Sequence, residues 1–186
     1  NRMAERRRSV AEALDGLFDP NTIAVVGASR TKGKLGQAVL ALLKSNGYRG
    51  KIIPVNPSGG EIEGLAAVRS LEEIDGPIDV VAHSLGAVST RAWLKEFDGA
   101  SKVRRFISLG GPHAGTTFFK LAPPSLWPVL DPDGYWVRRL SEGGEAVDTI
   151  VIRARYDQQV FPPERAALPG TREVVLQGHG HNSLLW

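Results

Sequence analysis

The chain has 186 residues with 42% hydrophobic content, and this length lets one core bury roughly 70% of the unfolded surface, so a single domain over residues 1–186 is expected. Its zero cysteines exclude disulfides, thiolate catalysis and cysteine-ligated zinc. The net charge of +3 comes from scattered basic residues, and no run approaches the roughly 20 apolar residues of a membrane span. We therefore expect a soluble protein, cytoplasmic by default, with no metal, no nucleic-acid partner and no membrane span.

Apolar runs and helical periods alternate along the first half of the chain. An amphipathic period predicts a helix over residues 5–18, and the continuous apolar run over 22–29 is typical of a strand buried on both faces. A helix is predicted over 34–48, with Asn46 and Gly47 as its stop signal. The remaining elements of this half are a strand over 51–57 and a weakly patterned stretch over 58–77, which predicts one short strand and one short helix.

The second half continues this alternation and sets the fold class. Alternating strands and helices predict parallel strands joined by right-handed crossovers, with helices on both faces of the sheet. The fold class is therefore α/β: a three-layer, doubly wound, mostly parallel sheet with ligands at the carboxyl ends of its strands. Residues 110–146 lack a clear period and predict a functional loop. The predicted elements are strand 78–83, helix 86–97, and strands 103–110, 148–156 and 171–177.

Ser84 stands at the abrupt junction of a predicted strand and a predicted helix, in the stretch AHSLG. Ala82 and Gly86 flank it as the small residues that a tight turn around a nucleophile needs. Such a turn aims the first amides of the helix at the site, which makes the Leu85 N–H a candidate oxyanion donor. The alternative is a serine that only caps the helix.

A serine nucleophile needs a base and an orienting acid. In this fold they are expected in the chain order serine, aspartate, histidine, each just after a later strand. Asp157 follows strand 148–156, and both His179 and His181 follow the last strand. The alternative for Asp157 is a turn or helix cap, and the alternative for the histidines is one packed and one solvated ring.

Other acidic residues and histidines fit these roles less well. Asp131 and Asp133 lie in the irregular loop, and Asp148 precedes its strand, at the wrong edge of the sheet. The alternation of side chains along a strand predicts that the side chain of His83 points away from the serine. His113 is expected to order its own loop rather than to touch substrate.

Four stretches of the second half stand in an order that is itself informative: VAHSLG, KVRRFISLGGPHAGT, ARYDQQVFPPERAALPG and GHGHNSLL. Together they resemble, in family order, the small α/β-hydrolase lipases, especially the minimal lidless bacterial type. Matching the motifs residue by residue implies that Ser84 is the nucleophile, Asp157 the acid and His181 the base. The same match makes His179 a neighbour of the base.

The stretch VVGASRTKGKLG after the first predicted strand has glycines and a following helix N-terminus, which suit a phosphate cradle. It is not a Walker loop, because Ala28 stands where the first glycine should be and Leu35 follows the lysine. It also lacks the glycine spacing of a dinucleotide fingerprint, and the second strand ends in Asn56 and Pro57 without the ribose-binding acid. An NAD enzyme is therefore not expected.

The motifs GAS and PVNP, with basic residues between them, lie within residues 14–80. This whole stretch resembles the CoA-binding domain of ADP-forming acyl-CoA synthetases and succinyl-CoA-ligase-like proteins. The resemblance implies that the segment holds the phosphates and adenine of CoA. Because AHSLG replaces the family's pantetheine loop, the implied CoA binding is weak. The residues implied for this site are Gly27, Ser29, Arg30, Lys34, Asn56 and Pro57.

The two resemblances meet inside the strand IDVV, so the chain resembles an engineered or recombined chimera. Residues 3–79 are the CoA-binding-domain-like segment and residues 80–186 the lipase-like segment of a Rossmann-like and α/β-hydrolase-like hybrid. In such a hybrid, strand 22–29 takes the place of the hydrolase strand whose following loop supplies the second oxyanion amide. The candidate donor there is the Ser29 N–H, with the Ala28 N–H as the alternative.

The leading functional hypothesis is a serine esterase of simple acyl esters that requires no cofactor. The lack of a long lid insertion favours short or medium acyl chains. The alternatives are a CoA-binding module without chemistry of its own, a thioesterase acting on acyl-CoA, and a recombination product with neither activity. The apolar loop residues that favour an acyl substrate are Phe118, Phe119, Leu121, Leu126 and Trp127.

Overall fold

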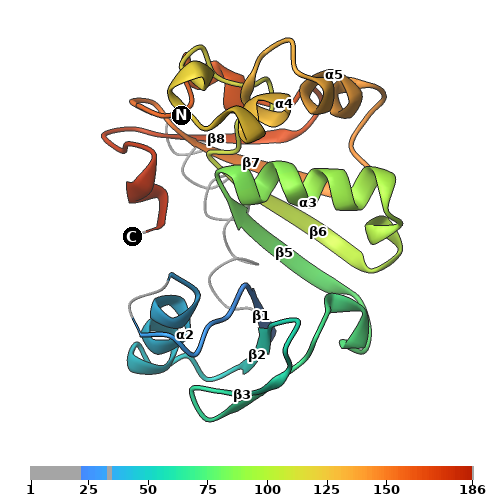
Figure 1. The fold of residues 1–186 in the computed structure, drawn as a ribbon, viewed down its shortest axis with the longest axis vertical. Coiled ribbons are helices and arrows are strands. Elements are labelled where there is room, and N and C mark those ends of the chain that lie inside the picture. The colour runs from blue at the N-terminus through green and yellow to red at the C-terminus, as the bar shows by residue number, and fades with distance from the viewer. Residues whose placement is uncertain (1–21, 33–34, 186) are drawn as a thin grey trace, which may run out of the picture. The chain divides into compact units, whose positions relative to one another are not determined.

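A computed structural model describes residues 22–32 and 35–185, and the chain divides into two compact units (Figure 1). These are an N-terminal unit, Asn1–Gly76, and a C-terminal unit, Pro77–Trp186. The helix expected over residues 5–18 lies outside the described residues. The α/β class with mostly parallel strands is confirmed, but the strands form separate sheets in the two units where the sequence predicted one sheet. A single-domain organisation stays a prediction.

The N-terminal unit is built on two parallel strands joined by a helix. Its elements are β1 (Thr22–Val26), α2 (Leu35–Ser45), β2 (Lys51–Val55), β3 (Gly60–Ile62), β4 (Leu65–Ala67) and the 3-10 helix η1 (Leu71–Glu73). β1 and β2 run parallel, with Ile23 opposite Ile52. The stretch predicted to hold one short strand instead forms a hairpin of β3 and β4, turned by Glu63 and Gly64, which both have positive φ.

A close approach between α2 and the loop after β1 organises this unit. A Cβ atom added to Gly36 would lie 2.0 Å from the Gly27 carbonyl oxygen, so only glycine fits at the second position of α2. The helix ends at the predicted stop signal, where the Tyr48 N–H donates to the Leu43 carbonyl over 3.1 Å. The buried core under the helix consists of Val25, Ala28, Leu40 and Ile62.

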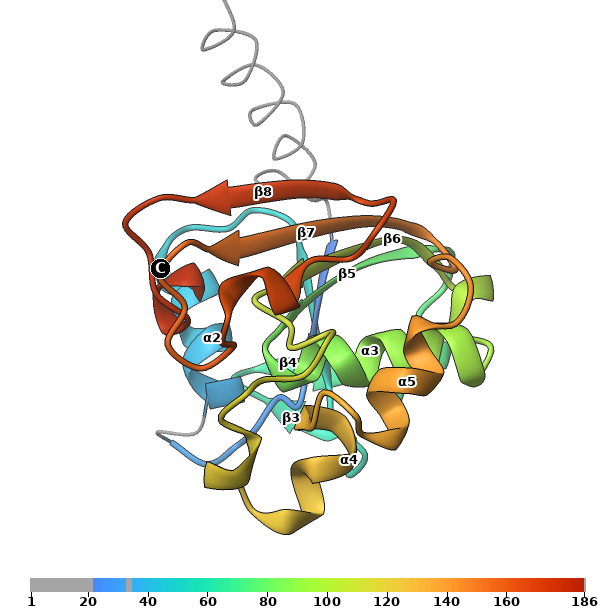
Figure 2. The same cartoon turned by 90° about the horizontal axis from the view of Figure 1, so that it is seen from above.

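The C-terminal unit carries a sheet of four parallel strands in the order β5-β6-β7-β8 (Figure 2). Its longer elements are β5 (Ile78–His83), α3 (Leu85–Glu96), β6 (Val103–Leu109), α4 (Trp127–Leu130), α5 (Tyr135–Ser141), β7 (Asp148–Ala154) and β8 (Arg172–Leu176). Short 3-10 helices are η2 (Gly99–Ser101), η3 (Phe119–Leu121), η4 (Pro124–Leu126), η5 (Pro163–Ala166) and η6 (Asn182–Leu185). In parallel strands the carboxyl ends meet at one edge, and that edge receives the loops that follow β5, β6, β7 and β8.

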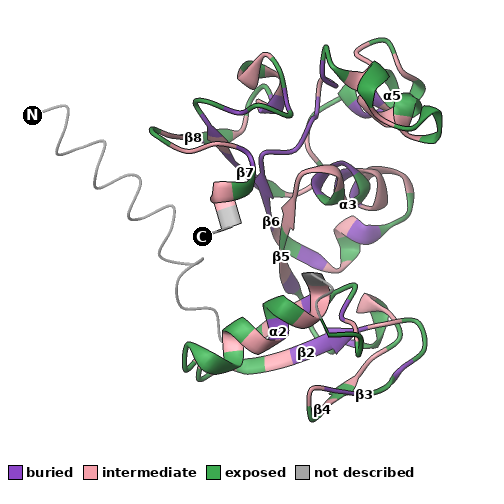
Figure 3. Ribbon diagram, turned by 60° about the vertical axis from the view of Figure 1, so that its left-hand side comes forward, coloured by how far each residue is buried: buried purple, intermediate pink, exposed green. Residues whose placement is uncertain are grey.

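Helix α3 packs on β5 and β6, and α5 packs against α3 on the same side of the sheet (Figure 2). Burial is concentrated along β6, β7 and the inner face of α3 (Figure 3). One inner position of α3 is Arg91, which is 2% exposed and donates to both carboxylate oxygens of Glu145 and to the Leu140 carbonyl. The ion pair and the carbonyl contact satisfy this buried charge.

Within the described residues, the predicted strands and helices agree with the structure to within a few residues, apart from the β3–β4 hairpin and the region between β6 and β7. This predicted loop holds α4 and α5. Among the described residues, no helix is both long enough and apolar enough to cross a membrane. The same part of the chain contains no group of three or more His, Cys, Asp or Glu side chains placed to share a metal ion.

Gly36→Ala should destabilise the protein, because the new Cβ overlaps the Gly27 carbonyl oxygen. Overpacking costs about 1–3 kcal/mol, and an overlap this severe with a backbone atom belongs to the upper part of that range, above the helix-propensity gain of about 1 kcal/mol. The matched control is Gly86→Ala, also at the second position of its helix, where no atom lies within 4 Å of the added Cβ. Urea unfolding followed by circular dichroism should show lower stability for the first variant and equal or higher stability for the second. Equal effects of the two substitutions would contradict the packing described here.

Candidate active site

Ser84 occupies a sharp turn between β5 and α3. Its backbone has φ 54° and ψ −128°, a left-handed conformation that is rare and costly for a residue with a side chain. The Ser84 N–H donates to the Leu109 carbonyl over 2.8 Å, which ties the turn to the end of β6. The Ser84 side chain makes no capping hydrogen bond to α3, so the structure does not support the alternative that this side chain caps the helix.

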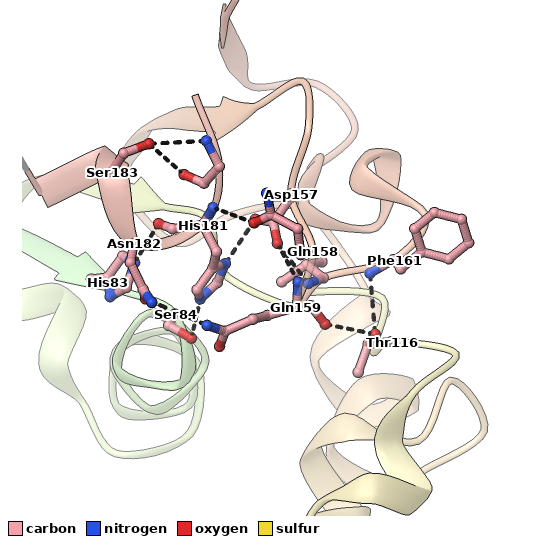
Figure 4. A network of polar contacts seen from close by, with 12 residues as sticks. His83, Ser84, Thr116, Asp157, Gln158, Gln159, Phe161, His181, Asn182 and Ser183 are labelled. Carbon is pink, nitrogen blue, oxygen red and sulfur yellow. Dashed lines mark hydrogen bonds and ion pairs between the residues drawn. The ribbon is translucent and has the colours of Figure 1, made fainter. Parts of the chain in front are cut away.

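The Ser84 hydroxyl instead meets His181, in the loop between β8 and η6. The Oγ atom lies 2.7 Å from Nε2 of the imidazole, although the two residues are 97 positions apart (Figure 4). The other ring nitrogen, Nδ1, lies 2.7 Å from Oδ2 of Asp157. Since a carboxylate only accepts, Nδ1 carries the hydrogen and Nε2 is left to accept from the serine.

Asp157 is held in the loop after β7 by two kinds of hydrogen bond. Its Oδ2 accepts from His181, and its Oδ1 accepts from the backbone amides of Gln159 and Val160, each over 2.8 Å. Burial raises the pKa of the carboxyl, but the hydrogen bonds from His181, Val160 and Gln159 outweigh burial, so the pKa lies below its usual value. The side chain is therefore ionised at neutral pH, beside a histidine that is 1% exposed.

Gly110, directly after β6, lies against the histidine and the acid of the site, and the sequence analysis did not single it out. Its φ is +55°, and an added Cβ would lie 2.8 Å from Leu184, 3.4 Å from Nδ1 of His181 and 3.5 Å from Oδ2 of Asp157. The absent side chain leaves room for the acid and the histidine to meet. The signal in the sequence was a glycine directly after a buried strand, at the carboxyl edge of the sheet.

The rival residues are engaged elsewhere. His179 places Nδ1 2.9 Å from the Gln177 carbonyl. Asp131 accepts from the Asp133 amide in a local turn, and Asp133 pairs with a neighbouring arginine. Asp148 pairs with Arg105 and Arg172 at the start of its strand. Of the expected candidates, the structure thus brings Ser84, His181 and Asp157 together.

His83 does not point away from the site, and that prediction is wrong. Its ring centroid lies 4.8 Å from that of His181, and its Nε2 lies 3.1 Å from the His181 carbonyl oxygen (Figure 4). The partner comes from the loop after β8, where the His181 carbonyl oxygen lies beside the His83 ring. The contact therefore depends on the path of a distant loop, which the pattern within β5 does not encode.

His113 orders its own loop, as its sequence context suggests. The ring is 4% exposed, and Nε2 lies 2.7 Å from the hydroxyl of Ser108, on β6. Burial lowers the pKa of His113 to about 3, with a smaller contribution from the charge of Arg91. The imidazole is therefore neutral at neutral pH.

The steric reason expected for a small residue at position 86 is absent, because nothing lies within 4 Å of a Cβ added there. Leu85 is the first residue of α3, and the N–H groups of a first helical turn have no partner inside the helix. Its amide therefore remains the candidate oxyanion donor. Ser29 belongs to the N-terminal unit, and its role as second donor stays a prediction.

The residues proposed for CoA lie around the loop after β1. Gly27 has φ 76°, and its amide donates to the Val55 carbonyl over 3.1 Å. The Ser29 hydroxyl accepts from the Thr31 amide over 3.1 Å. This loop leads toward the N-terminus of α2, but Lys34 lies outside the described residues.

Two further residues of this set tie the loops of the N-terminal unit together. The Asn56 amide group donates to the Ala28 carbonyl over 2.7 Å and begins the turn that contains Pro57. The Arg30 guanidinium donates to the Gly59 carbonyl and, over 3.0 Å, to the Glu61 carbonyl. These contacts hold an exposed cationic group beside the loop after β1, and this chemistry fits an anionic phosphate.

Comparison with known proteins shows the family of the chain. The CoA binding domain family matches residues 21–133, more than half of the chain, so this protein belongs to that family. The alpha subunit of the ADP-forming acetate–CoA ligase I of Pyrococcus furiosus is 53% identical over 51 residues, which are 27% of this chain and 11% of the ligase subunit. The ADP-forming acetate–CoA ligase II of Archaeoglobus fulgidus is 45% identical over 67 residues, or 36% of this chain and 10% of the ligase.

These matches span only about a tenth of the length of the ligases. Solved structures add a second likeness, to lipases, at the level of the fold. The mature lipase BlEst2 of Bacillus licheniformis covers 90% of this chain and 86% of its own, with a TM-score of 0.55 and 15% identity. Lipase B of Aspergillus fumigatus covers 60% of this chain and 34% of its own, with a TM-score of 0.50 and 20% identity. The chain thus belongs to the CoA binding domain family and also shares a likeness of fold with lipases.

The buried neutral His113 should make stability depend on pH. The folded pKa lies below that of the unfolded chain, so the unfolded state alone takes up this proton as the pH falls below about 6.5. The contribution of the neutral His113 to the free energy of unfolding is complete above that pH. It is lost toward pH 3, at about 1.4 kcal/mol per pH unit. When the pH falls from 7.5 to 5, the free energy of unfolding measured in urea should therefore decrease by about 2 kcal/mol less in His113→Gln than in the wild type. A wild-type dependence in His113→Gln would contradict this account.

Proposed function

We propose that the C-terminal unit is a serine hydrolase of simple acyl esters. The observation that carries the proposal is the continuous pair of 2.7 Å contacts from the Ser84 hydroxyl to His181 and from His181 to Asp157. Nucleophile, base and orienting acid in hydrogen-bond reach of one another are what acyl transfer requires. The lipase-like fold is consistent with this chemistry but is not by itself evidence for it.

In the first half of the reaction, the Ser84 Oγ attacks the ester carbonyl carbon while its proton passes to Nε2 of His181. A carbon–oxygen bond forms, and the electron pair of the carbonyl moves onto oxygen. Collapse of this tetrahedral intermediate breaks the bond to the alcohol, which leaves with the proton from Nε2. Asp157 stays ionised throughout, fixes the imidazole tautomer and stabilises the transient imidazolium.

In the second half, water replaces the alcohol. His181 takes a proton from the water as its oxygen adds to the acyl carbon, and the second tetrahedral intermediate expels Ser84, which recovers its proton. The carboxylic acid is released and the enzyme is restored. During both additions the Leu85 amide is the proposed donor to the oxyanion, and each such donor contributes about 100- to 1,000-fold in rate.

Short or medium acyl chains are the proposed substrates. Phe118 and Phe161 stack with ring centroids 5.3 Å apart, and both remain about half exposed. The Phe161 amide donates to the Thr116 hydroxyl, which links this apolar pair to the loop that carries the acid (Figure 4). The pair offers apolar surface of limited extent, which suits a short chain.

Ser84→Ala should reduce hydrolysis of p-nitrophenyl butyrate to the rate without enzyme, because no other group replaces the attacking oxygen. Asp157→Asn should lower kcat about 10⁴-fold, because a carboxamide favours the wrong imidazole tautomer. The matched control is Ser89→Ala, an exposed serine on α3 that should keep wild-type kinetics. Equal turnover in wild type and Ser84→Ala would exclude the esterase.

CoA binding by the N-terminal unit is a second proposed function, and the family match over residues 21–133 favours it. The residues proposed to hold the phosphates surround Gly27 and Arg30, with Asn56 and Pro57 in the adjoining turn. CoA bound there would act as an acyl carrier. The resemblance implies weak affinity, because the pantetheine loop of the family is replaced.

Arg30→Ala should weaken CoA binding about tenfold or more in calorimetric titration, because a charge-assisted hydrogen bond contributes about 1.5–3 kcal/mol. Arg49→Ala, which removes an exposed arginine of the same unit, is the control and should bind as wild type does. Ser84→Ala should also bind normally. Absence of heat with wild-type protein at millimolar CoA would remove this function.

A further inference from the structure

His83 contacts His181 at two separate points. Its Nε2 lies 3.1 Å from the His181 carbonyl oxygen, and the two rings pack with centroids 4.8 Å apart and planes at 48°. One contact involves the backbone of His181 and the other its ring. Figure 4 shows His83 close to His181 and Ser84.

The carbonyl contact defines the tautomer of His83. A carbonyl oxygen only accepts, so Nε2 of His83 must carry the hydrogen. Burial lowers the pKa of this half-buried imidazole, which is therefore neutral at neutral pH. A neutral ring donates to the carbonyl without placing a positive charge beside the proposed base.

The backbone of His181 depends on such side-chain contacts, because it lies between β8 and η6 rather than within a strand. Its N–H lies 3.4 Å from Oε1 of Gln158, and its carbonyl lies 3.1 Å from His83. The bond from His83 is the shorter of these two anchors. It comes from the residue next to Ser84, so it couples the position of the base directly to the turn that carries the nucleophile.

We propose that His83 is a positioning residue that holds the His181 imidazole within proton-transfer reach of Ser84. This inference rests on the proposed esterase function and adds a fourth residue to it. His83 does not exchange protons with the substrate and acts only through His181. Misplacement of a reacting group by about 1 Å costs about 100-fold in rate, so a bond that fixes the base has a measurable effect.

Two substitutions separate the parts of this contact. His83→Phe keeps a ring against His181 but removes the donor, and should lower kcat on p-nitrophenyl butyrate about 10- to 100-fold with little change in KM. His83→Gln keeps an N–H donor at similar reach and should recover much of this loss. His179→Gln is the matched control and should match wild type, because the hydrogen bond of its ring is with the Gln177 carbonyl rather than with His181.

A second measurement does not depend on turnover. The hydrogen between His181 and Asp157 should give a low-field proton resonance in the resting protein. We expect this resonance in wild type and in His83→Gln, and its broadening or loss in His83→Phe while the amide spectrum keeps the wild-type fold.

The outcomes distinguish the two proposals. Wild-type kcat and an unchanged low-field resonance in His83→Phe would overturn the positioning role, and so would equal losses in His83→Phe and His83→Gln. If wild type shows no turnover that depends on Ser84, but the resonance still responds to His83→Phe and is rescued in His83→Gln, the esterase fails and the positioning of His181 stands.

Discussion

The parallel register of β5, β6, β7 and β8 is the constraint on which the candidate site depends. Because all four strands run in one direction, the residues that follow them emerge at one edge of the sheet. Ser84 follows β5, Gly110 follows β6, Asp157 follows β7 and His181 follows β8. A chain reversal in any of these strands would send one of the four residues to the opposite edge, so the common direction of the strands determines which residues meet at the site.

Within that edge, polar contacts offset the cost of burial. Asp157 is 4% exposed, and an isolated carboxylate at such a depth would be strongly unfavourable. Two backbone amides and the imidazole of His181 supply the missing solvation, which keeps the acid ionised and the imidazole in one tautomer. At Ser84 the cost is backbone strain, because a left-handed conformation costs about 1–3 kcal/mol for a residue with a side chain. This conformation presents the hydroxyl toward the imidazole. His83 ties the strained turn to the loop of the base.

The sequence predicted the four strands of this unit and the polar residues after β5, β7 and β8, because continuous apolar runs and the polar residues that follow them are local signals. It did not predict α5, because Tyr135–Ser141 is short and lies in a stretch rich in proline and glycine. The contact of His83 with His181 was also missed, since it depends on the path of a loop almost one hundred residues away. In the N-terminal unit, the strand pair followed from the apolar pattern, whereas the hairpin turn at Glu63 required a positive φ that residue type alone does not indicate.

One chain thus combines a CoA binding domain family match with a continuous contact from Ser84 through His181 to Asp157, and the central proposal is that Ser84 is an activated nucleophile. Labelling with a fluorophosphonate ester, followed by intact mass measurement and peptide mapping, tests this claim most directly because the reagent needs no substrate recognition beyond the site. The account predicts one covalent adduct per chain, located on Ser84 and absent from Ser84→Ala. No adduct on correctly folded wild-type protein, or an adduct spread over exposed serines such as Ser89, would contradict it.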